Sequence, residues 1–259
     1  MRLVWEDHFN GDTLNASLWN VLEQVHRGGV YTKENVRVEN GMLVMQTIAQ
    51  NLTIKQGSED VQFYVSSGAV NTSGHFEQKH GRWEISVKLP MVYQSGGYIL
   101  HSSIWLFENS ARPGNTGCPQ EIDVVEQYVA TAGPVSSAVG NIHPFNGTHG
   151  SCQKVPYIRP PTTARGDWTS SFTNFTVDWT ESFIAFYVNG KVYANFATQG
   201  VAVAAFTDPL YLALTACVMN REPVLKVDVL PQQYLVDFVK YYEWVEELEE
   251  LDKVEGLQT

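Results

Sequence analysis

The sequence predicts an all-β fold, an antiparallel β-sandwich or jelly roll. Three observations support it: short runs in which apolar and polar residues alternate, turn dipeptides between those runs, and scarce helical periodicity. The chain has 259 residues, of which 44% are hydrophobic. That length and content suit one large β domain with one core. We expect this domain over residues 1–244 and an acidic tail over 245–259.

The expected strands follow one another between Gly, Pro and Asn turns. In chain order they are 36–39, 83–87, 104–107, 122–129, 183–188, 211–218 and 235–241. Asn40-Gly41 and Asn189-Gly190 each follow an alternating apolar run, which predicts a type I′ hairpin turn. Residues 110–120 and 156–171 are rich in Pro, Ser and Thr, so long surface loops are expected there.

The charge of the chain bears on its partners. The formal net charge is -11 and the pI is near 5.0, which argues against nucleic acid and anionic membranes, since both bind cationic faces. From Glu243 onward there are seven acids and one lysine, so the body is only mildly acidic. No apolar run approaches the roughly 18 residues that cross a bilayer. Neutral partners remain, and we expect a monomer.

One feature favours secretion, although the first residues lack the apolar segment of a signal peptide. Asn-X-Ser/Thr sequons occur at Asn15, Asn51, Asn71, Asn146 and Asn174, which favours a secreted glycoprotein, with chance sequons as the alternative. Cys118 and Cys152 lie in loop-like stretches, so they are candidates for a disulfide. Cys217, inside an apolar run, is expected to be a buried thiol.

The segment 121–126 concentrates carboxylates in what otherwise resembles a core strand. Glu121 and Asp123 point to the same face of a strand, whereas Glu126, five residues along, points to the other. A β-bulge at Val124-Val125 restores the phase and places all three acids on one face. Two glutamates effectively four positions apart can then converge as they do in a retaining glycosidase.

Crowding of these acids has an electrostatic consequence: they cannot all ionise freely, so at least one should hold a proton near neutral pH, as a general acid needs. The alternative is an acidic solvent face on an edge strand, which discourages aggregation. The chain lacks the G-x-S-x-G, H-E-x-x-H, phosphate-loop and dinucleotide motifs.

The segment 121–126 resembles the signature E-[IL]-D-x-x-E of glycoside hydrolase family 16, in the bulged form of its laminarinase-like branch. The resemblance extends over about Trp5 to Trp244. Its segments, in order, are 5–11 with Leu14 and Trp19, 34–36, 40–43, 81–84, 88–90, 105–106, the acids, His143, 172–179, 186–190 and 236–239.

This resemblance implies a catalytic jelly roll with a concave substrate cleft and no required cofactor. Glu121 would be the nucleophile, Asp123 the assisting acid and Glu126 the acid/base. Asn35, Trp105 and His143 match positions that contact sugar; a turn-capping asparagine, a core tryptophan and a satisfied loop histidine are the structural alternatives. Asp237 matches a position that often helps to hold a structural calcium, although one carboxylate cannot define an oxygen cage.

Three departures from the family bear on specificity. The family commonly has Trp-Pro-Ala-Phe-Trp where this chain has 101–105, His-Ser-Ser-Ile-Trp, so one stacking tryptophan is lost. Ala69 stands where laminarinase-like members usually have arginine, and Thr173 where a histidine is expected. We therefore expect a retaining endo-hydrolase of a β-linked polysaccharide, with β-1,3- or mixed-linkage β-glucan first. The alternatives are a transglycosylase on a β-glucan or galactan and a non-catalytic carbohydrate-recognition module.

Overall fold

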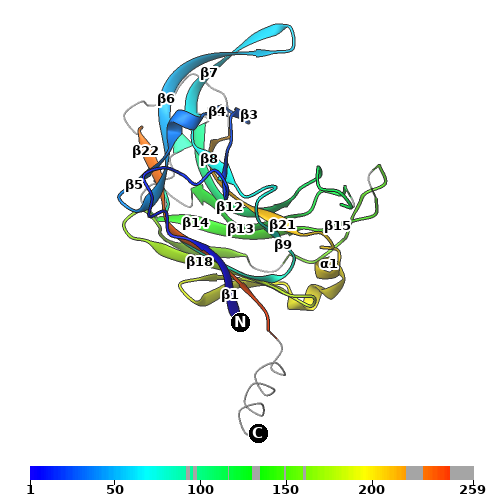
Figure 1. The fold of residues 1–259 in the computed structure, drawn as a ribbon. Coiled ribbons are helices and arrows are strands. Elements are labelled where there is room, and N and C mark those ends of the chain that lie inside the picture. The colour runs from blue at the N-terminus through cyan, green and yellow to red at the C-terminus, as the bar shows by residue number, and fades with distance from the viewer. Residues whose placement is uncertain are drawn as a thin grey trace.

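The computed structural model describes residues 1–91, 94–95, 98–115, 117–129, 135–148, 150–159, 162–219 and 230–245. Almost all regular structure in these ranges is β, and the two large sheets form stacked layers (Figure 1). The antiparallel sandwich predicted from the sequence is confirmed. The strands run from Arg2 to Glu243. The expected acidic tail lies outside the described residues from 246 onward.

The first sheet has eleven strands, which pair antiparallel except for β4 and β7. Its order is β20 (Lys191–Asn195), β19 (Ile184–Val188), β18 (Thr173–Trp179), β10 (Gly81–Lys88), β22 (Gln232–Glu243), β6 (Met42–Gln56), β7 (Glu59–Ser67), β4 (Gly29–Tyr31) and β3 (Gln24–His26), with β1 (Arg2–Asp7) on β22 and β5 (Val36–Glu39) on β6.

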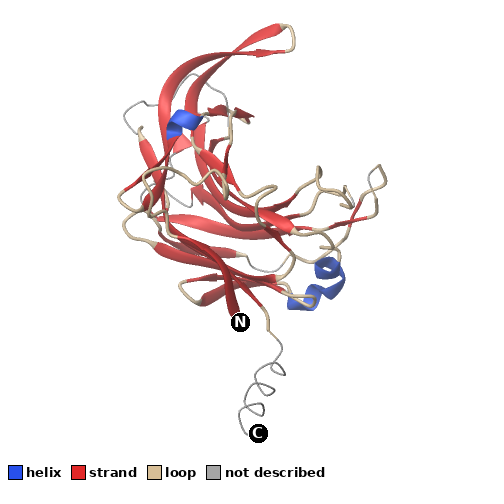
Figure 2. Ribbon diagram, in the orientation of Figure 1, coloured by secondary structure: helices blue, strands red, loops and turns tan. Residues whose placement is uncertain are grey.

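The second sheet has nine strands. Its order is β17 (Thr163–Asp167), β14 (Val135–His143), β13 (Glu121–Val129), β12 (Tyr98–Glu108), β21 (Leu210–Val218), β8 (Ala69–Asn71) and β2 (Asn20–Val21), with β11 (Gln94–Ser95) on β12 and β9 (Glu77–Gln78) on β21. The remaining elements are the hairpin β15 (Phe145–Asn146) and β16 (Gln153–Lys154), and the short helices η1 (Lys33–Asn35), η2 (Ala197–Gln199) and α1 (Gly200–Ala204) (Figure 2).

The core lies between the two sheets and follows from the alternation of the strands. On β12, Ile104 and Leu106 are fully buried in the same cluster as Trp83 and Ile85 of β10 in the other sheet. Trp105, between them in sequence, points to the opposite face of β12 and lines a cleft. Burial of the apolar face therefore fixes which side chains the nine-stranded sheet presents to solvent.

Most of the expected strands and both hairpin turns are confirmed. Asn40 and Asn189 have φ values of 52° and 47°, and each is followed by a glycine with positive φ, as a type I′ turn requires. The prediction of one continuous loop over 156–171 was wrong, because β17 forms within it. This edge strand pairs through its backbone with β14, and its exposed alternate positions leave little apolar signal in the sequence.

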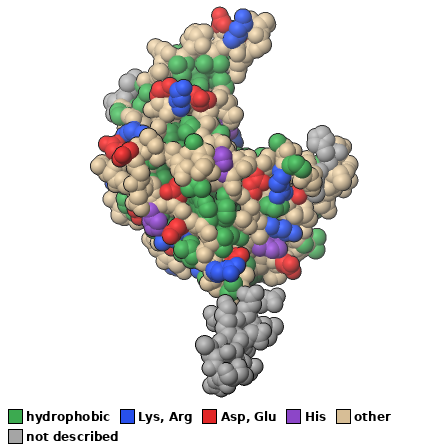
Figure 3. Space-filling model, viewed as in Figure 1, with side chains coloured by type: hydrophobic (Ala, Val, Ile, Leu, Met, Phe, Trp, Pro, Cys, Tyr) green, Lys and Arg blue, Asp and Glu red, His purple; other side chains and the backbone are tan. Residues whose placement is uncertain are grey.

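A long ribbon formed by β6 and β7 was not predicted. Its outer part stands away from the two layers (Figure 1), and the surface is hollowed between this ribbon and the body (Figure 3). Cys118 and Cys152 form the disulfide for which they were candidates, and Cys217 is a buried free thiol, as expected. Within the described ranges, no helix has the length and apolar character needed to cross a membrane.

Candidate active site

The three clustered acids lie on β13, an inner strand of the nine-stranded sheet between β14 and β12. Ile104 and Trp105 of β12 are consecutive, yet their partners on β13 are Val125 and Asp123, so Val124 is the extra residue of a β-bulge. The pairing of β13 with β14 shifts between Asp123 and Glu126. The bulge therefore lies where the sequence placed it, and all three acids line the same cleft.

Cross-strand neighbours surround each acid on this face. Glu121 is paired with Phe107 on β12 and with His143 on β14. Asp123 is paired with Trp105. Directly opposed side chains in a sheet are close enough to touch, so each carboxylate has a defined neighbour on either side. The sheet thus presents an aromatic row beside the acidic row.

Burial makes the first two acids difficult to ionise. It is the main cause that raises the pKa of Glu121, to about 8, and the charge of Asp123 adds to it. Burial, followed by the charge of Glu126, raises the pKa of Asp123 to about 7. A hydrogen bond links Glu121 and Asp123, so the two form one titrating pair. Near neutral pH this pair retains a proton.

Glu126 has different surroundings. The hydroxyl of Tyr128 donates to its Oε1 at 3.0 Å, and Nε2 of His101 lies 3.6 Å from the same oxygen. Its side chain is 22% exposed, whereas that of Asp123 is 4% exposed. Glu126 is therefore in closer contact with solvent than the buried Asp123.

The bulge is stabilised from the other sheet. The hydroxyl of Tyr193, on β20, donates a hydrogen bond to the carbonyl oxygen of Val124. This carbonyl belongs to the extra residue of the bulge, so the usual ladder partner is not opposite it. Tyr193 was not identified from the sequence, since nothing local distinguishes it from other strand tyrosines.

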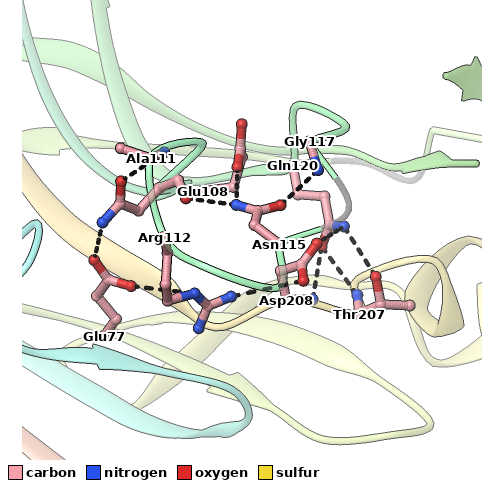
Figure 4. Close-up of polar contacts among 10 residues, drawn as sticks. Glu77, Glu108, Ala111, Arg112, Asn115, Gly117, Gln120, Thr207 and Asp208 are labelled. Carbon is pink, nitrogen blue, oxygen red and sulfur yellow. Dashed lines mark hydrogen bonds and ion pairs between the residues drawn. The ribbon is translucent and has the colours of Figure 1, made fainter. Parts of the chain in front are cut away.

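A polar network fixes the chain just before Glu121 (Figure 4). The buried Gln120 accepts a hydrogen bond from the backbone N–H of Thr207 at 2.9 Å, and its amide donates to Asp208 at 3.1 Å. Asp208 is also 3.6 Å from the guanidinium of Arg112, which lies in the loop between β12 and β13. The network therefore attaches the interior of that loop at Arg112, and its end at Gln120, to Thr207 and Asp208.

The predicted sugar-contacting residues fall into two groups. Trp105 lines the cleft, and His143 lines its continuation, 3.1 Å from Asp123. Asn35 is buried instead, and its amide donates to the hydroxyl of Ser66 at 2.8 Å. A contact between Asn35 and sugar stays a prediction, because the cavity linings around the acids do not include it.

Asp237 lies on β22, away from the acids, where the pairing with β10 skips it. Its Oδ2 accepts from the hydroxyl of Ser86 at 3.4 Å. Among the described residues, the group of three metal-ligating side chains that lie close together is Glu121, Asp123 and His143, whose ligand atoms are within 4.8 Å of one another. Asp237 does not belong to such a group among the described residues. Calcium at Asp237 therefore stays a prediction.

The cleft continues on both sides of the acids. A cavity of about 210 Å³ extends toward β12 and β21, and one of about 600 Å³ extends toward β14 and β17. Arg27, in the turn between β3 and β4, lines both of them, and Arg159 lines the larger. Neither arginine was identified from the sequence, because both lie far from the acids along the chain and come near them only in the tertiary fold. The sequence did single out position 101, as a departure from the family.

The comparisons with known proteins agree with this geometry. The family model "Glycosyl hydrolases family 16" matches residues 24–226. The chain is 26% identical to glucan endo-1,3-beta-glucosidase A1 of Niallia circulans over 93% of its own length, and spans 38% of that relative. It is 27% identical to a beta-glucanase of Rhodothermus marinus, with 94% of this chain and 86% of the relative covered.

Solved structures show the same fold. The laminarinase catalytic domain of Thermotoga maritima superimposes with a TM-score of 0.70 at 23% identity, with 95% of this chain and 99% of that domain covered. The family match spans more than three quarters of the chain and includes the bulged strand with its three acids. This chain belongs to glycosyl hydrolase family 16.

Proposed function

We propose that this protein is a retaining endo-β-glucanase that cleaves β-1,3- or mixed-linkage glucan. The observation that supports it best is the bulge at Val124, which brings Glu121, Asp123 and Glu126 to one face of the sheet. The beta-glucanase of Rhodothermus marinus, which the chain resembles over most of both lengths, supports the substrate class.

In the proposed mechanism, the Glu121 carboxylate attacks the anomeric carbon while Glu126 protonates the leaving glycosidic oxygen. Glu126 then removes a proton from water, which hydrolyses the glycosyl ester on Glu121. The proton of the Glu121–Asp123 pair must reside on Asp123 during the attack. From there its O–H donates to Glu121, and Nε2 of His143 lies 3.1 Å from Oδ2 of Asp123.

The endo mode is supported by the two cavities that flank the acids. A chain can extend past the cleavage point in both directions when the cleft is continuous on both sides. Trp105 and Phe107 of β12 offer flat apolar surfaces beside the acids, suited to the apolar face of a sugar ring. The proposed reaction needs no cofactor, because Glu121 supplies the nucleophile and Glu126 the acid and base.

Transglycosylation remains the second candidate, since it uses the same carboxylates with a sugar in place of water. The cleft face of β12 bears on this candidate at one point, because His101 stands where the family commonly has a stacking tryptophan. Secretion is supported by the Cys118–Cys152 disulfide, which persists in oxidising compartments. We propose a monomer, with polysaccharide as its partner.

The experiment that tests the function is an oligosaccharide product profile by mass spectrometry. Purified wild type, Glu121→Ser and Glu126→Gln proteins are incubated with laminarin, mixed-linkage glucan, agarose and xyloglucan, with and without short acceptor sugars. Wild type should release oligomers from the first two polymers. Both variants should lose at least about a thousandfold of that activity while keeping a native circular dichroism spectrum.

Each other outcome has a defined meaning. Acceptor-extended products would favour transglycosylation, and release from agarose alone would replace glucan by galactan. Retained turnover in Glu121→Ser would remove Glu121 from the nucleophile role. A polymer that binds to wild type and stays uncut would favour the recognition module.

A rescue assay tests the role of Glu126 directly. When Glu126→Gln is incubated with an activated aryl glycoside, added azide should restore turnover and give a β-glycosyl azide, because azide attacks the glycosyl ester without a general base.

A further inference from the structure

The structure places a buried histidine against the proposed acid/base. His101, on β12, is 4% exposed, and its ring packs on Tyr128 with 4.9 Å between ring centroids. Its Nδ1 lies 3.0 Å from the carbonyl oxygen of Gln127. A carbonyl oxygen only accepts hydrogen bonds, so Nδ1 bears the hydrogen in this contact.

That contact fixes the tautomer of the ring. In a neutral imidazole with hydrogen on Nδ1, Nε2 has a lone pair and accepts a hydrogen bond. Nε2 faces Oε1 of Glu126 at 3.6 Å, within reach after a small rotation of the carboxyl group. A lone pair at this place repels a carboxylate and accepts from a protonated carboxyl group. Tyr128 acts in the opposite sense, because its hydroxyl donates to the same oxygen.

The other groups that face His101 leave the ring neutral. Cys217, opposite it on β21, is a thiol whose pKa is raised to about 12 by burial. Burial is also the largest influence on His101 and lowers its pKa, the Arg27 charge acts in the same direction, and the Glu126 charge opposes them. His26, whose ring stacks on Tyr31, has a pKa that is itself lowered by burial.

We infer that His101 is a positioning residue that accepts a hydrogen bond from the protonated carboxyl group of Glu126. This hydrogen bond keeps Glu126 protonated until the glycosidic bond breaks. The inference rests on the acid/base role proposed for Glu126. Rotation of the carboxyl group turns its hydroxyl to the glycosidic oxygen. The Glu126 O–H bond then breaks, the leaving sugar gains the hydrogen, and the anomeric carbon exchanges that sugar oxygen for an oxygen of Glu121.

Removal of each of the two neighbours of Glu126, His101 and Tyr128, should shift the pH profile in opposite directions. The measurement is the pH profile of kcat/KM on the polymer that wild type cleaves, whose basic limb reports the ionisation of the acid. His101→Phe retains a ring against Tyr128 and removes the acceptor, so the basic limb should move to lower pH by about one unit. Tyr128→Phe removes the donor to the carboxylate, so the limb should move to higher pH.

Further arms separate this role from a structural one. His101→Gln offers an amide oxygen as acceptor and should return the basic limb toward that of wild type. An aryl glycoside with a dinitrophenol leaving group needs no acid, so His101→Phe and wild type should cleave it within about twofold of each other. The control is His8→Phe, which removes an exposed histidine paired with Glu6 and should leave the profile unchanged.

A readout that needs no activity is the 15N NMR spectrum of the histidine rings. It should show His101 with hydrogen on Nδ1 and an unprotonated Nε2 near neutral pH. Hydrogen on Nε2, or basic limbs of His101→Phe and Tyr128→Phe that shift together or stay in place, would overturn the inference. If wild type cleaves no polymer, the proposed function fails instead, and the NMR spectrum still decides the tautomer.

Discussion

Glu121 and Asp123 are buried carboxyl groups, and burial opposes their ionisation. The unfolded chain exposes both to water, where they titrate near pH 4. In the folded protein the pKa of Glu121 is raised to about 8 and that of Asp123 to about 7. Between these limits the folded state holds more protons than the unfolded state, so its stability falls as pH rises.

This gives a prediction about stability. The free energy of unfolding of wild type should decrease between about pH 4.5 and pH 8, and Glu121→Gln should reduce that decrease by about 1–3 kcal/mol. Denaturant titrations at pH 5, 6.5 and 8 measure it. Glu34→Gln, which changes a glutamate outside the cleft, serves as the control and should keep the wild-type slope. Equal slopes in Glu121→Gln and wild type would mean that Glu121 ionises freely in the folded state.

The sequence identified the acids but not the side chains that surround them. Glu121, Asp123 and Glu126 are recognisable because carboxylates in a β-branched strand are unusual. Arg27, His101 and Tyr128 are ordinary residues in their own segments. They matter because separate strands bring them to the same carboxylates, and a local pattern does not contain that information.

Among the secondary-structure elements, β13 depends most on an unusual local geometry. Its bulge adds one residue opposite β12 and leaves the carbonyl of Val124 to be satisfied by the hydroxyl of Tyr193. A ladder hydrogen bond is thus replaced by one from the opposite sheet. The hairpin of β19 and β20 that holds Tyr193 therefore contributes to the spacing of the acids.

Tyr193→Phe should consequently affect chemistry more than binding. We expect kcat to fall about tenfold and KM to change by less than about twofold, because a relaxed bulge displaces Glu126 from Glu121. Stability should fall by about 1–3 kcal/mol, since a buried carbonyl loses its partner. Steady-state kinetics and denaturant titration measure both effects.

Tyr187→Phe is the matched control for this variant. Tyr187 lies on the same hairpin and its hydroxyl interacts with Asp178 in the eleven-stranded sheet. Its removal should leave kcat at the wild-type value. A loss of stability in Tyr193→Phe with kcat unchanged would show that the bulge keeps its geometry without the hydroxyl.

Other elements show where sequence patterns are informative. Asn40-Gly41 and Asn189-Gly190 were predictable because left-handed backbone conformations strongly favour Asn and Gly. β17 was missed because an edge strand that pairs through its backbone needs no apolar alternation. The ribbon of β6 and β7 was missed because its outer part is largely exposed.

At the scale of the whole molecule, the disulfide and the polar network both secure the loop that precedes the acids. Cys118 and Cys152 are 34 residues apart. Gln120 is bonded separately to Thr207 and Asp208. The network should therefore hold Glu121 in place even when the disulfide is absent.

Removal of the disulfide should accordingly change stability and spare activity. The double variant Cys118→Ser, Cys152→Ser should lose about 2–4 kcal/mol of unfolding free energy through the greater freedom of its unfolded chain. Its kcat/KM, measured well below the melting temperature, should stay within about twofold of wild type. A large loss of kcat/KM with stability intact would assign the disulfide a positioning role. Differential scanning calorimetry and initial-rate assays separate the two results.

The sequence motif of the five sequons does not show which of them are exposed in the fold. Asn15, Asn51 and Asn146 are exposed, whereas Asn71 is buried in β8 and bonded to the amide of Asn20. Modification of the folded protein is therefore expected only at exposed sites. Glycosylation and secretion stay predictions, and the sequence motif alone does not distinguish these positions.

The sequence by itself determined the fold class, the hairpin turns, the acidic row with its bulge and the family, since all of these depend on local periodicity and on short motifs that follow one another along the chain. The tertiary structure decided which side chains surround the acids: the lone pair of His101 and the donor of Tyr128 at Glu126, the hydroxyl of Tyr193 at the bulge, and Arg27 over the cleft. The physical reason is that hydrogen bonds and electrostatic interactions act over a few ångströms in space, whereas strand pairing brings together residues far apart in the chain.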